Sequence, residues 1–269
     1  MLPGVFRKTL RDLRGPVAAW GIGLAILAVA MVFVFSSVRA NGALQKWDAI
    51  VRGLAPAILA FVGGEDIASV AEFEGFMRME LLNFVPAILA VFAVAEGSAA
   101  IAREEERRTI DLLMAQPVRR WRVVVEKFAA MAVGAYAIAA TTGLGLLIAT
   151  RFVRVEHPWH RLILGAANAV PPALVVGALS LLGSCTLRRR LHAAILGAAF
   201  LVASFFLNVV GQVADLIRPW RKLSVFYWYT VTPPLSGEIV TCQMVLLLAV
   251  AAILVAVAAV AFGRKDLAV

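Results

Sequence analysis

The chain contains six continuous apolar stretches, each of about 20 residues or more, which is the length a helix needs to cross a bilayer. They are rich in Ala, Leu and Val, whereas membrane-spanning strands would be short and alternating. We therefore predict an all-α integral membrane protein with a single transmembrane domain over residues 1–269. The predicted spans are approximately Val17–Val38, Leu81–Ala102, Phe128–Thr150, Leu162–Leu182, Leu191–Val213 and Ile239–Phe262.

The overall composition excludes the main classes of soluble protein. Hydrophobic residues make up 62% of the chain and charged residues 16%, whereas a soluble domain is about 45–50% apolar and about 25% charged. A disordered chain would not carry so much apolar surface. Two cysteines are too few for a disulfide scaffold.

The distribution of Lys and Arg predicts the orientation of the chain. Sixteen of the 26 basic residues lie on the side that holds both termini and the links after the second and fourth spans. Basic residues accumulate on the cytoplasmic side, so we expect both termini there. The net charge of +9 then reflects basic residues beside anionic lipid headgroups. Since the chain has no basic domain, zinc spacing or helix-turn-helix signal, nucleic-acid binding is not expected.

Two shorter segments are expected to lie along the membrane. Leu54–Val62 is too short to span the bilayer and contains Pro56, so it predicts an interfacial or re-entrant helix. Residues 3–15 predict an N-terminal interfacial helix with basic residues around one apolar face. That face consists of Phe6, Leu10, Leu13 and Val17.

No motif for an enzyme or a metal site is present. The chain lacks a G-x-x-x-x-G-K-[ST] phosphate-binding loop and the H-E-x-x-H and G-x-S-x-G motifs. His157 and His160 form a weak H-x-x-H pair, which we interpret as polar residues at headgroup level rather than as metal ligands. We therefore predict a chain without catalytic residues or a bound metal.

Few polar side chains lie inside the predicted spans. Glu96 is the one clear ionisable residue there, about two helical turns from the expected cytoplasmic boundary. It serves either a structural role or a role in a pathway or gate. Asn83, Asn168 and Asn208 either line a cavity or bond a neighbouring helix. Two consecutive prolines, Pro171 and Pro172, are expected to kink the fourth span.

The cytoplasmic link between spans two and three carries the strongest functional signal. It reads REEERRTIDLLMAQPVRRWRVVVEK over residues 103–127. Glu104 and Arg108 have the spacing of a favourable helical ion pair, and Pro117 should end that helix. Charged residues flank an apolar stripe at helical spacing, which suits either a partner's groove or a lipid surface. The stripe consists of Ile110, Leu113 and Met114.

This link resembles the ABC-2 type permeases, in which an E-E-x-x-G-T-[LI]-[ED]-L-L run precedes a proline, a basic cluster and a lysine at the third span. The matching residues here are 104–113, Pro117, Arg119, Arg120 and Lys127. Arg108 stands where the family usually has glycine. The layout of the whole chain is also similar, including Glu74-Gly75-Phe76, Glu80, Pro86, Phe262, Arg264, Asp266 and Leu267.

The resemblance implies the permease subunit of an ATP-binding-cassette exporter in the plasma (inner) membrane. It implies a coupling helix between spans two and three that docks on a separate cytoplasmic ATPase, which is present in two copies and binds ATP and Mg. It also implies a second permease subunit, for which we expect a homodimer. The docking residues carried over are Glu104, Glu105, Glu106, Thr109, Leu112 and Leu113.

The substrate class follows from the spans rather than from the link. Because no charged pocket is visible in the sequence, we expect a hydrophobic or amphipathic substrate such as a lipid, a peptide or a drug. Two other functions remain open. One is a membrane-embedded enzyme, although paired carboxylates and His clusters are missing. The other is an assembly or anchoring protein that is linked to an ATPase but does not transport.

Overall fold

The computed structural model describes residues 4–62, 71–109, 119–153, 155, 157–187, 189–229 and 241–265. Within these ranges the chain forms helices joined by turns, and no strand occurs. The helices are α1 (Val5–Asp12), α2 (Arg14–Ala40), α3 (Leu44–Arg52), α4 (Pro56–Val62), α5 (Phe73–Met77), α6 (Val85–Ala99), α7 (Ala102–Glu106), α9 (Arg120–Phe152), α10 (Trp159–Ala167), α11 (Val170–Thr186), α12 (Arg190–Val213) and α14 (Thr241–Arg264), with a π-helical turn η1 (Arg78–Leu82) and a 3₁₀ helix η2 (Arg218–Leu223).

Six helical segments are long and apolar enough to cross a membrane, which confirms the predicted all-α fold with six spans. Several of them extend beyond the apolar stretches, because charged residues at a membrane surface remain helical. The second segment, for example, begins at Phe73 rather than at Leu81 and includes Arg78 and Glu80. The segments are Arg14–Ala40, Phe73–Ala99, Arg120–Phe152, Trp159–Thr186, Arg190–Val213 and Cys242–Arg264.

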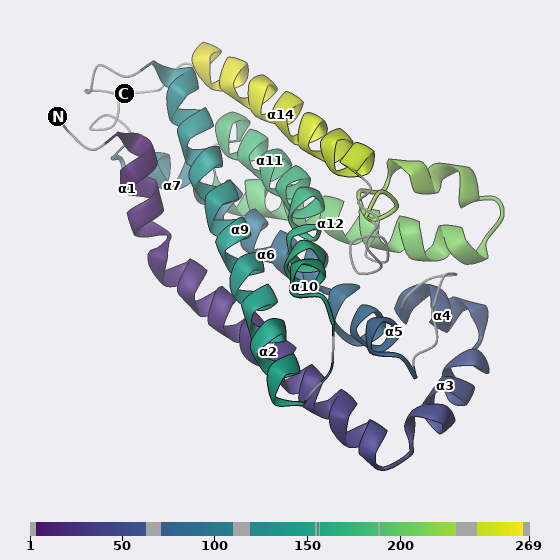
Figure 1. Cartoon of the computed structure of the whole chain (residues 1–269). Helices are drawn as coiled ribbons and strands as arrows, with labels where there is room; N and C mark the ends of the chain where they lie inside the picture. The colour runs from purple at the N-terminus through teal and green to yellow at the C-terminus, as the bar shows by residue number, and fades with distance from the viewer. Residues whose placement is uncertain are drawn as a thin grey trace.

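The core of the bundle forms around α11, which packs against α6, α12 and α14. A glycine permits a close backbone approach between α6 and α11. A Cβ atom on Gly97 would lie 2.5 Å from the carbonyl oxygen of Gly177. The opposite flank is formed by α2, which packs along α9 (Figure 1). The most exposed span in the single chain is α12, where only 17% of the apolar window is buried.

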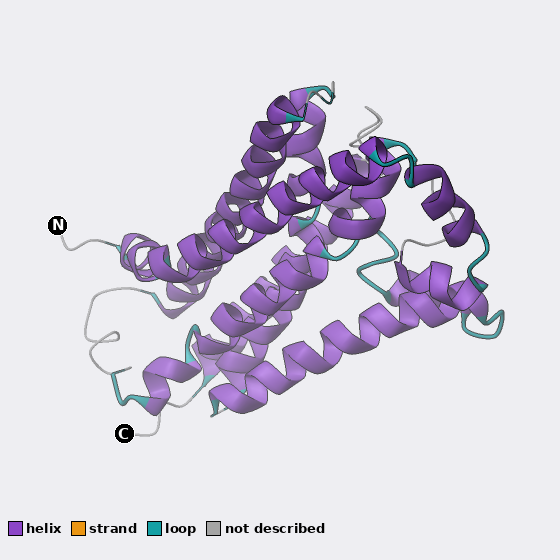
Figure 2. Ribbon diagram, turned by 90° about the horizontal axis from the view of Figure 1, so that it is seen from below, coloured by secondary structure: helices purple, strands orange, loops and turns teal. Residues whose placement is uncertain are grey.

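Both termini lie at the same end of the bundle in two perpendicular views (Figures 1 and 2). This is the end that the Lys and Arg distribution predicts to be cytoplasmic. The N-terminal helix α1 packs against α9 there and buries Val5. The short helix α7 lies at the same end (Figure 1).

The opposite end of the bundle carries short helices between the spans, among them α3 and α4. The segment predicted as an interfacial or re-entrant piece forms α4, which packs against α12 through an edge-to-face contact between Phe61 and Phe205. Phe226 contacts Phe205 in the same way, and the Tyr229 hydroxyl donates to the carbonyl oxygen of Leu82 at 2.9 Å. The neighbouring Pro233 and Pro234 lie outside the described residues.

The fourth span is interrupted where its two prolines predict a kink. Helix α10 ends at Ala167 and α11 begins at Val170, with Pro171 and Pro172 in the first turn of α11. A proline lacks the backbone N–H and is therefore best tolerated in a first turn, where that N–H has no partner within the helix.

Candidate functional site

The link between spans two and three begins with a break in the helix between Ala99, where α6 ends, and Ala102, where α7 begins. The Ser184 hydroxyl of α11 accepts hydrogen bonds from the backbone N–H groups of Ile101 at 2.9 Å and Ala102 at 2.8 Å. All three residues are buried. A single side chain therefore satisfies two buried donors at the break and fixes the start of α7 against α11.

Helix α7 ends in a Schellman motif. The backbone N–H of Thr109 donates to the carbonyl oxygen of Glu104 at 2.9 Å, and that of Arg108 donates to Glu105 at 3.0 Å. This turn requires a left-handed residue, and Arg108 adopts a φ of 54°. The expected helical ion pair between Glu104 and Arg108 is therefore wrong, because the helix ends at Glu106. The turn also gives a physical reason why glycine is favoured at position 108.

The Glu104 carboxylate turns back onto its own loop and onto α9. It accepts a hydrogen bond from the Thr109 hydroxyl at 2.6 Å and lies 3.4 Å from the Lys127 ammonium. Lys127 also donates to the carbonyl oxygen of Ala100. Burial raises the pKa of the Glu104 carboxyl, but the Thr109 hydrogen bond and the Lys127 charge outweigh it, so the pKa lies below its ordinary value of 4.5.

The next two glutamates contact two further helices. Glu105 forms an ion pair with Lys265 at the end of α14, with N–O distances of 2.7 and 2.9 Å and about one sixth of each side chain exposed. Glu106 accepts a hydrogen bond at 2.8 Å from the backbone N–H of Arg190, the first residue of α12. A carboxylate is favourable at this position because unpaired N–H groups gather at a helix N-terminus. Three consecutive glutamates, Glu104, Glu105 and Glu106, thus join α7 to α9, α14 and α12, and we call them the α7 triad.

The first and last helices are held to α9 at the same end. The Glu126 carboxylate accepts a hydrogen bond from the backbone N–H of Phe6 at 2.9 Å and pairs with Arg122 at 2.6 Å. Arg120 donates to the carbonyl oxygen of Lys265 at 2.8 Å. The start of α9 therefore connects α1, α7 and the end of α14.

The link just described lies within a match to a known family that covers nearly the whole chain. A family model described as ABC-2 family transporter protein matches residues 6–267. The chain belongs to this ABC-2 family. Comparison with curated proteins gives no significant match. Together with the six spans, the family identifies the chain as a multi-pass membrane protein and a permease of an ABC transporter.

Membership of the ABC-2 family has two general implications. ABC-2 permeases generally act as non-catalytic membrane subunits, and they work with an ABC ATPase. The residues predicted to dock on that ATPase are only partly described. Glu104, Glu105, Glu106 and Thr109 make the contacts given above, whereas Leu112 and Leu113 lie outside the described residues. Docking itself stays a prediction, and the amphipathic stripe that includes Ile110 and Met114 lies outside the described residues too.

The four pathway candidates of this ABC-2 permease do not gather in one place. Glu96 lines a cavity near α1, whereas the Asn83 amide donates to the carbonyl oxygen of Phe61 at 3.5 Å. Asn168 is buried at the break between α10 and α11. The backbone carbonyl oxygen of Asn208 accepts a hydrogen bond from the side-chain amide of Gln212 at 3.3 Å. No common lining follows from these positions, so their role in a pathway stays a prediction.

The two histidines of the H-x-x-H pair lie apart from the α7 triad. The side chain of His157 is 7% exposed and lies 3.6 Å from a Glu74 carboxylate oxygen. Burial, followed by the nearby Arg161 and His160, lowers the pKa of His157 below 6.5. Among the described residues, no group of three or more His, Cys, Asp and Glu side chains is placed to hold a metal ion.

Two contributors to the site were missed by the sequence reasoning. Lys265 lies 160 residues from its partner Glu105, and Ser184 lies more than 80 residues from the break that it stabilises. Neither contact has a local sequence signal. The sequence contains an acidic run, REEE at 103–106, and a distant basic pair, Arg264-Lys265. Only a comparison of charges between these two segments would have indicated the contact.

Proposed function

We propose that the chain is the permease subunit of an ABC exporter that moves a hydrophobic or amphipathic substrate out of the plasma (inner) membrane or the cytoplasm. The single observation that carries this proposal is the family match over residues 6–267. ATP and Mg bind to the partner ATPase, which is present in two copies. A lipid, a peptide or a drug fits the apolar character of the spans.

The α7 triad supports a specific coupling role for the link. Because Glu104, Glu105 and Glu106 each contact a different helix, a force applied to residues 109–118 would reach α9, α14 and α12 together. We propose that Thr109, Leu112 and Leu113 contact the ATPase and that the triad supports docking by holding α7. Closure of the two ATPases on ATP would then move these spans as a unit.

Docking is tested by the double substitution Leu112→Asp with Leu113→Asp. We expect the ATPase to be lost from the complex purified in mild detergent, because two charges cannot replace an apolar contact. The matched control is Leu216→Asp with Leu223→Asp, which changes two exposed leucines near the opposite end of α12. Normal co-purification of the first variant would disprove the docking assignment.

Export is tested with inverted membrane vesicles that contain the permease and its ATPase. ATP should drive accumulation of an amphipathic dye or lipid inside the vesicles, and the same compounds should stimulate ATP hydrolysis by the reconstituted complex. A complex that hydrolyses ATP without responding to any such compound would instead favour an assembly or anchoring role.

A permease homodimer is supported by α12, which leaves a long apolar face uncovered in the single chain. Ile195, Val202 and Phe206 are each more than half exposed. We expect a Val202→Cys variant, with Cys185 and Cys242 replaced, to form a covalent dimer on oxidation in membranes. Ile148→Cys on the exposed face of α9 is the control. Crosslinking at position 148 but not at 202 would place the interface elsewhere.

A further inference from the structure

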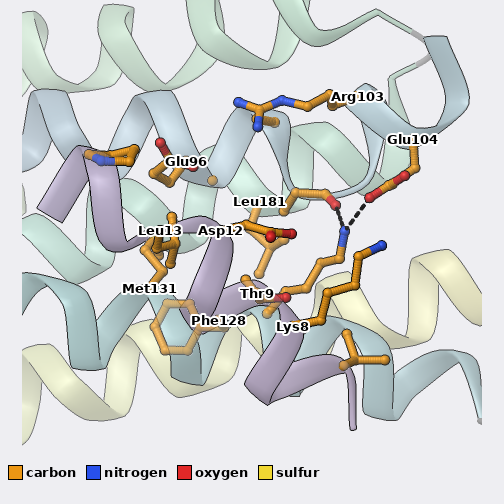
Figure 3. Close-up of a pocket in the computed structure, with 16 residues that line it drawn as sticks. Lys8, Thr9, Asp12, Leu13, Glu96, Arg103, Glu104, Phe128, Met131 and Leu181 are labelled. Atoms are coloured by element: carbon orange, nitrogen blue, oxygen red, sulfur yellow. Dashed lines mark hydrogen bonds and ion pairs between the residues drawn. The ribbon is translucent and has the colours of Figure 1, made fainter. Parts of the chain in front are cut away.

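A cavity of roughly 150 Å³ lies beneath α1, at the end of the bundle that holds both termini. Its walls come from α1, the last turns of α6, helix α7, the start of α9 and Leu181 of α11 (Figure 3). The volume is far larger than the roughly 10–15 Å³ that one water needs. A small polar group can therefore enter it, and we call it the α1 cavity.

Six charged side chains line the α1 cavity, and they differ in what they contact. Lys127 and Glu104 pair with each other at 3.4 Å. Within the described parts of the chain, the other four make no hydrogen bond or ion pair through their side chains. Figure 3 labels these four around the cavity, two from α1 and two from α6 and α7. They are Lys8, Asp12, Glu96 and Arg103.

The four side chains without such a contact are two cations and two anions, and they differ in how exposed they are. Lys8 and Asp12 are exposed on α1 at the rim, whereas Glu96 and Arg103 are only partly exposed. A charge that leaves water without a partner is costly. Glu96 and Arg103 both face the same space, and the charges of Arg103 and Arg190 attract the Glu96 carboxylate, but no hydrogen bond or ion pair joins Glu96 to either. An arrangement of this kind is stabilised by a ligand that brings one cation and one anion.

The uncharged part of the wall adds a second requirement. Leu13, Phe128, Met131 and Leu181 line the cavity beside the charges. Amphipathic helices such as α1 lie at the level of lipid headgroups, where polar and apolar surfaces meet. The ligand should therefore be polar at one end and apolar at the other.

We propose that the α1 cavity binds the zwitterionic headgroup of a membrane phospholipid. The phosphate would lie between Lys8 and Arg103, the ammonium would lie against Glu96 and Asp12, and the glycerol end would contact Phe128 and Met131. A purely anionic headgroup is disfavoured, because the two carboxylates repel it and it brings no cation to pair with them. The proposal does not depend on export, since a bound lipid is expected whether or not the protein transports.

Lipid binding to the purified full-length chain tests this proposal. Native mass spectrometry in mild detergent would titrate phosphatidylethanolamine, phosphatidylcholine and phosphatidylglycerol with identical acyl chains. We expect both zwitterionic lipids to bind about tenfold more tightly than phosphatidylglycerol, which corresponds to about 1.4 kcal/mol. Equal or tighter binding of phosphatidylglycerol would overturn the proposal.

Two substitutions assign the two charges of the headgroup. Glu96→Gln should weaken both zwitterionic lipids about tenfold and strengthen phosphatidylglycerol binding, because one of the two repelling carboxylates is gone, whereas Arg103→Gln should weaken all three by about tenfold. The control is Arg122→Gln, because Arg122 lies at the same end but does not line the cavity. If both variants bind like the wild type, the site lies elsewhere and the proposal fails.

Folding is checked separately, by thermal unfolding and gel filtration of each variant. Should Glu96→Gln unfold, Asp12→Asn replaces it, because Asp12 is exposed on α1 and its substitution leaves the core intact. Asp12→Asn is expected to weaken zwitterionic lipids selectively, and unchanged selectivity in that folded variant would count against the assigned ammonium position.

Discussion

At the scale of single residues, Arg108 sits in a conformation that suits glycine. Its φ of 54° costs a non-glycine residue roughly 1 kcal/mol or more. Arg108→Gly should therefore stabilise the protein by about 1 kcal/mol, measured by thermal unfolding in detergent. Arg107→Gly is the matched control, because Arg107 has a φ of −83°. It should give no gain, and equal stabilisation by both variants would argue against the left-handed turn.

The ionisation of Glu104 predicts how the stability of this turn depends on pH. Its pKa is lower in the folded chain than the ordinary 4.5, so the unfolded chain binds the proton more tightly. The contribution of Glu104 is therefore fully present above about pH 4.5 and is lost as the pH falls through the folded value.

Glu104→Gln should thus lower the melting temperature at pH 7 but have a much smaller effect near pH 3. Thr109→Val, which removes the 2.6 Å hydrogen bond to the carboxylate, should show part of the same dependence. A Glu104→Gln effect of equal size at both pH values would contradict the assigned role of the charge.

At the scale of elements, the junction of α6 and α7 depends on one hydroxyl group. Ser184→Ala leaves the buried N–H groups of Ile101 and Ala102 without their acceptor. An unsatisfied buried donor costs about 1–3 kcal/mol, so we expect a loss of at least about 2 kcal/mol. Ser98→Ala is the control, since this equally buried hydroxyl donates only to Ala95 of its own helix. Similar losses of stability in both variants would show that the loss does not come from the two backbone N–H groups at the junction.

The elements themselves were largely predictable, because a membrane demands long apolar helices and leaves few alternatives. The six spans and the interruption at Pro171 therefore follow from composition and from proline geometry. Helix α3 (Leu44–Arg52) was missed, since its sequence mixes polar and apolar residues without a span-length apolar run. The extension of the second span to Phe73 was missed because Arg78 and Glu80 interrupt the hydropathy pattern.

At the scale of the whole molecule, the site depends on contacts between distant segments. The local sequence of residues 104–106 identifies a charged helix, but it does not say where the carboxylates point. Their partners come from α9, α12 and α14, and only the packed bundle brings these together. The same limit applies to the α1 cavity, in which Asp12 and Glu96 come from different helices. Periodicity within one segment carries no information about such pairs.

The pair of Glu105 and Lys265 tests whether the triad acts within the chain. Each single charge reversal, Glu105→Lys or Lys265→Glu, places like charges at a site where only about one sixth of each side chain is exposed. We expect each to lower the stability of the protein by about 2 kcal/mol, because a partly buried charge loses its partner. The double reversal should recover most of that loss, as measured by thermal unfolding.

The same double reversal separates support of docking from direct docking. If Glu105 only holds α7 against α14, the swapped pair restores both the stability and the co-purification of the ATPase. The ion pair then forms equally well with the lysine at position 105 and the glutamate at position 265. If Glu105 touches the ATPase itself, the swapped pair restores stability alone, because the lysine then faces the partner. We expect the first result, since both oxygens of the Glu105 carboxylate already accept from the Lys265 ammonium, at 2.7 and 2.9 Å.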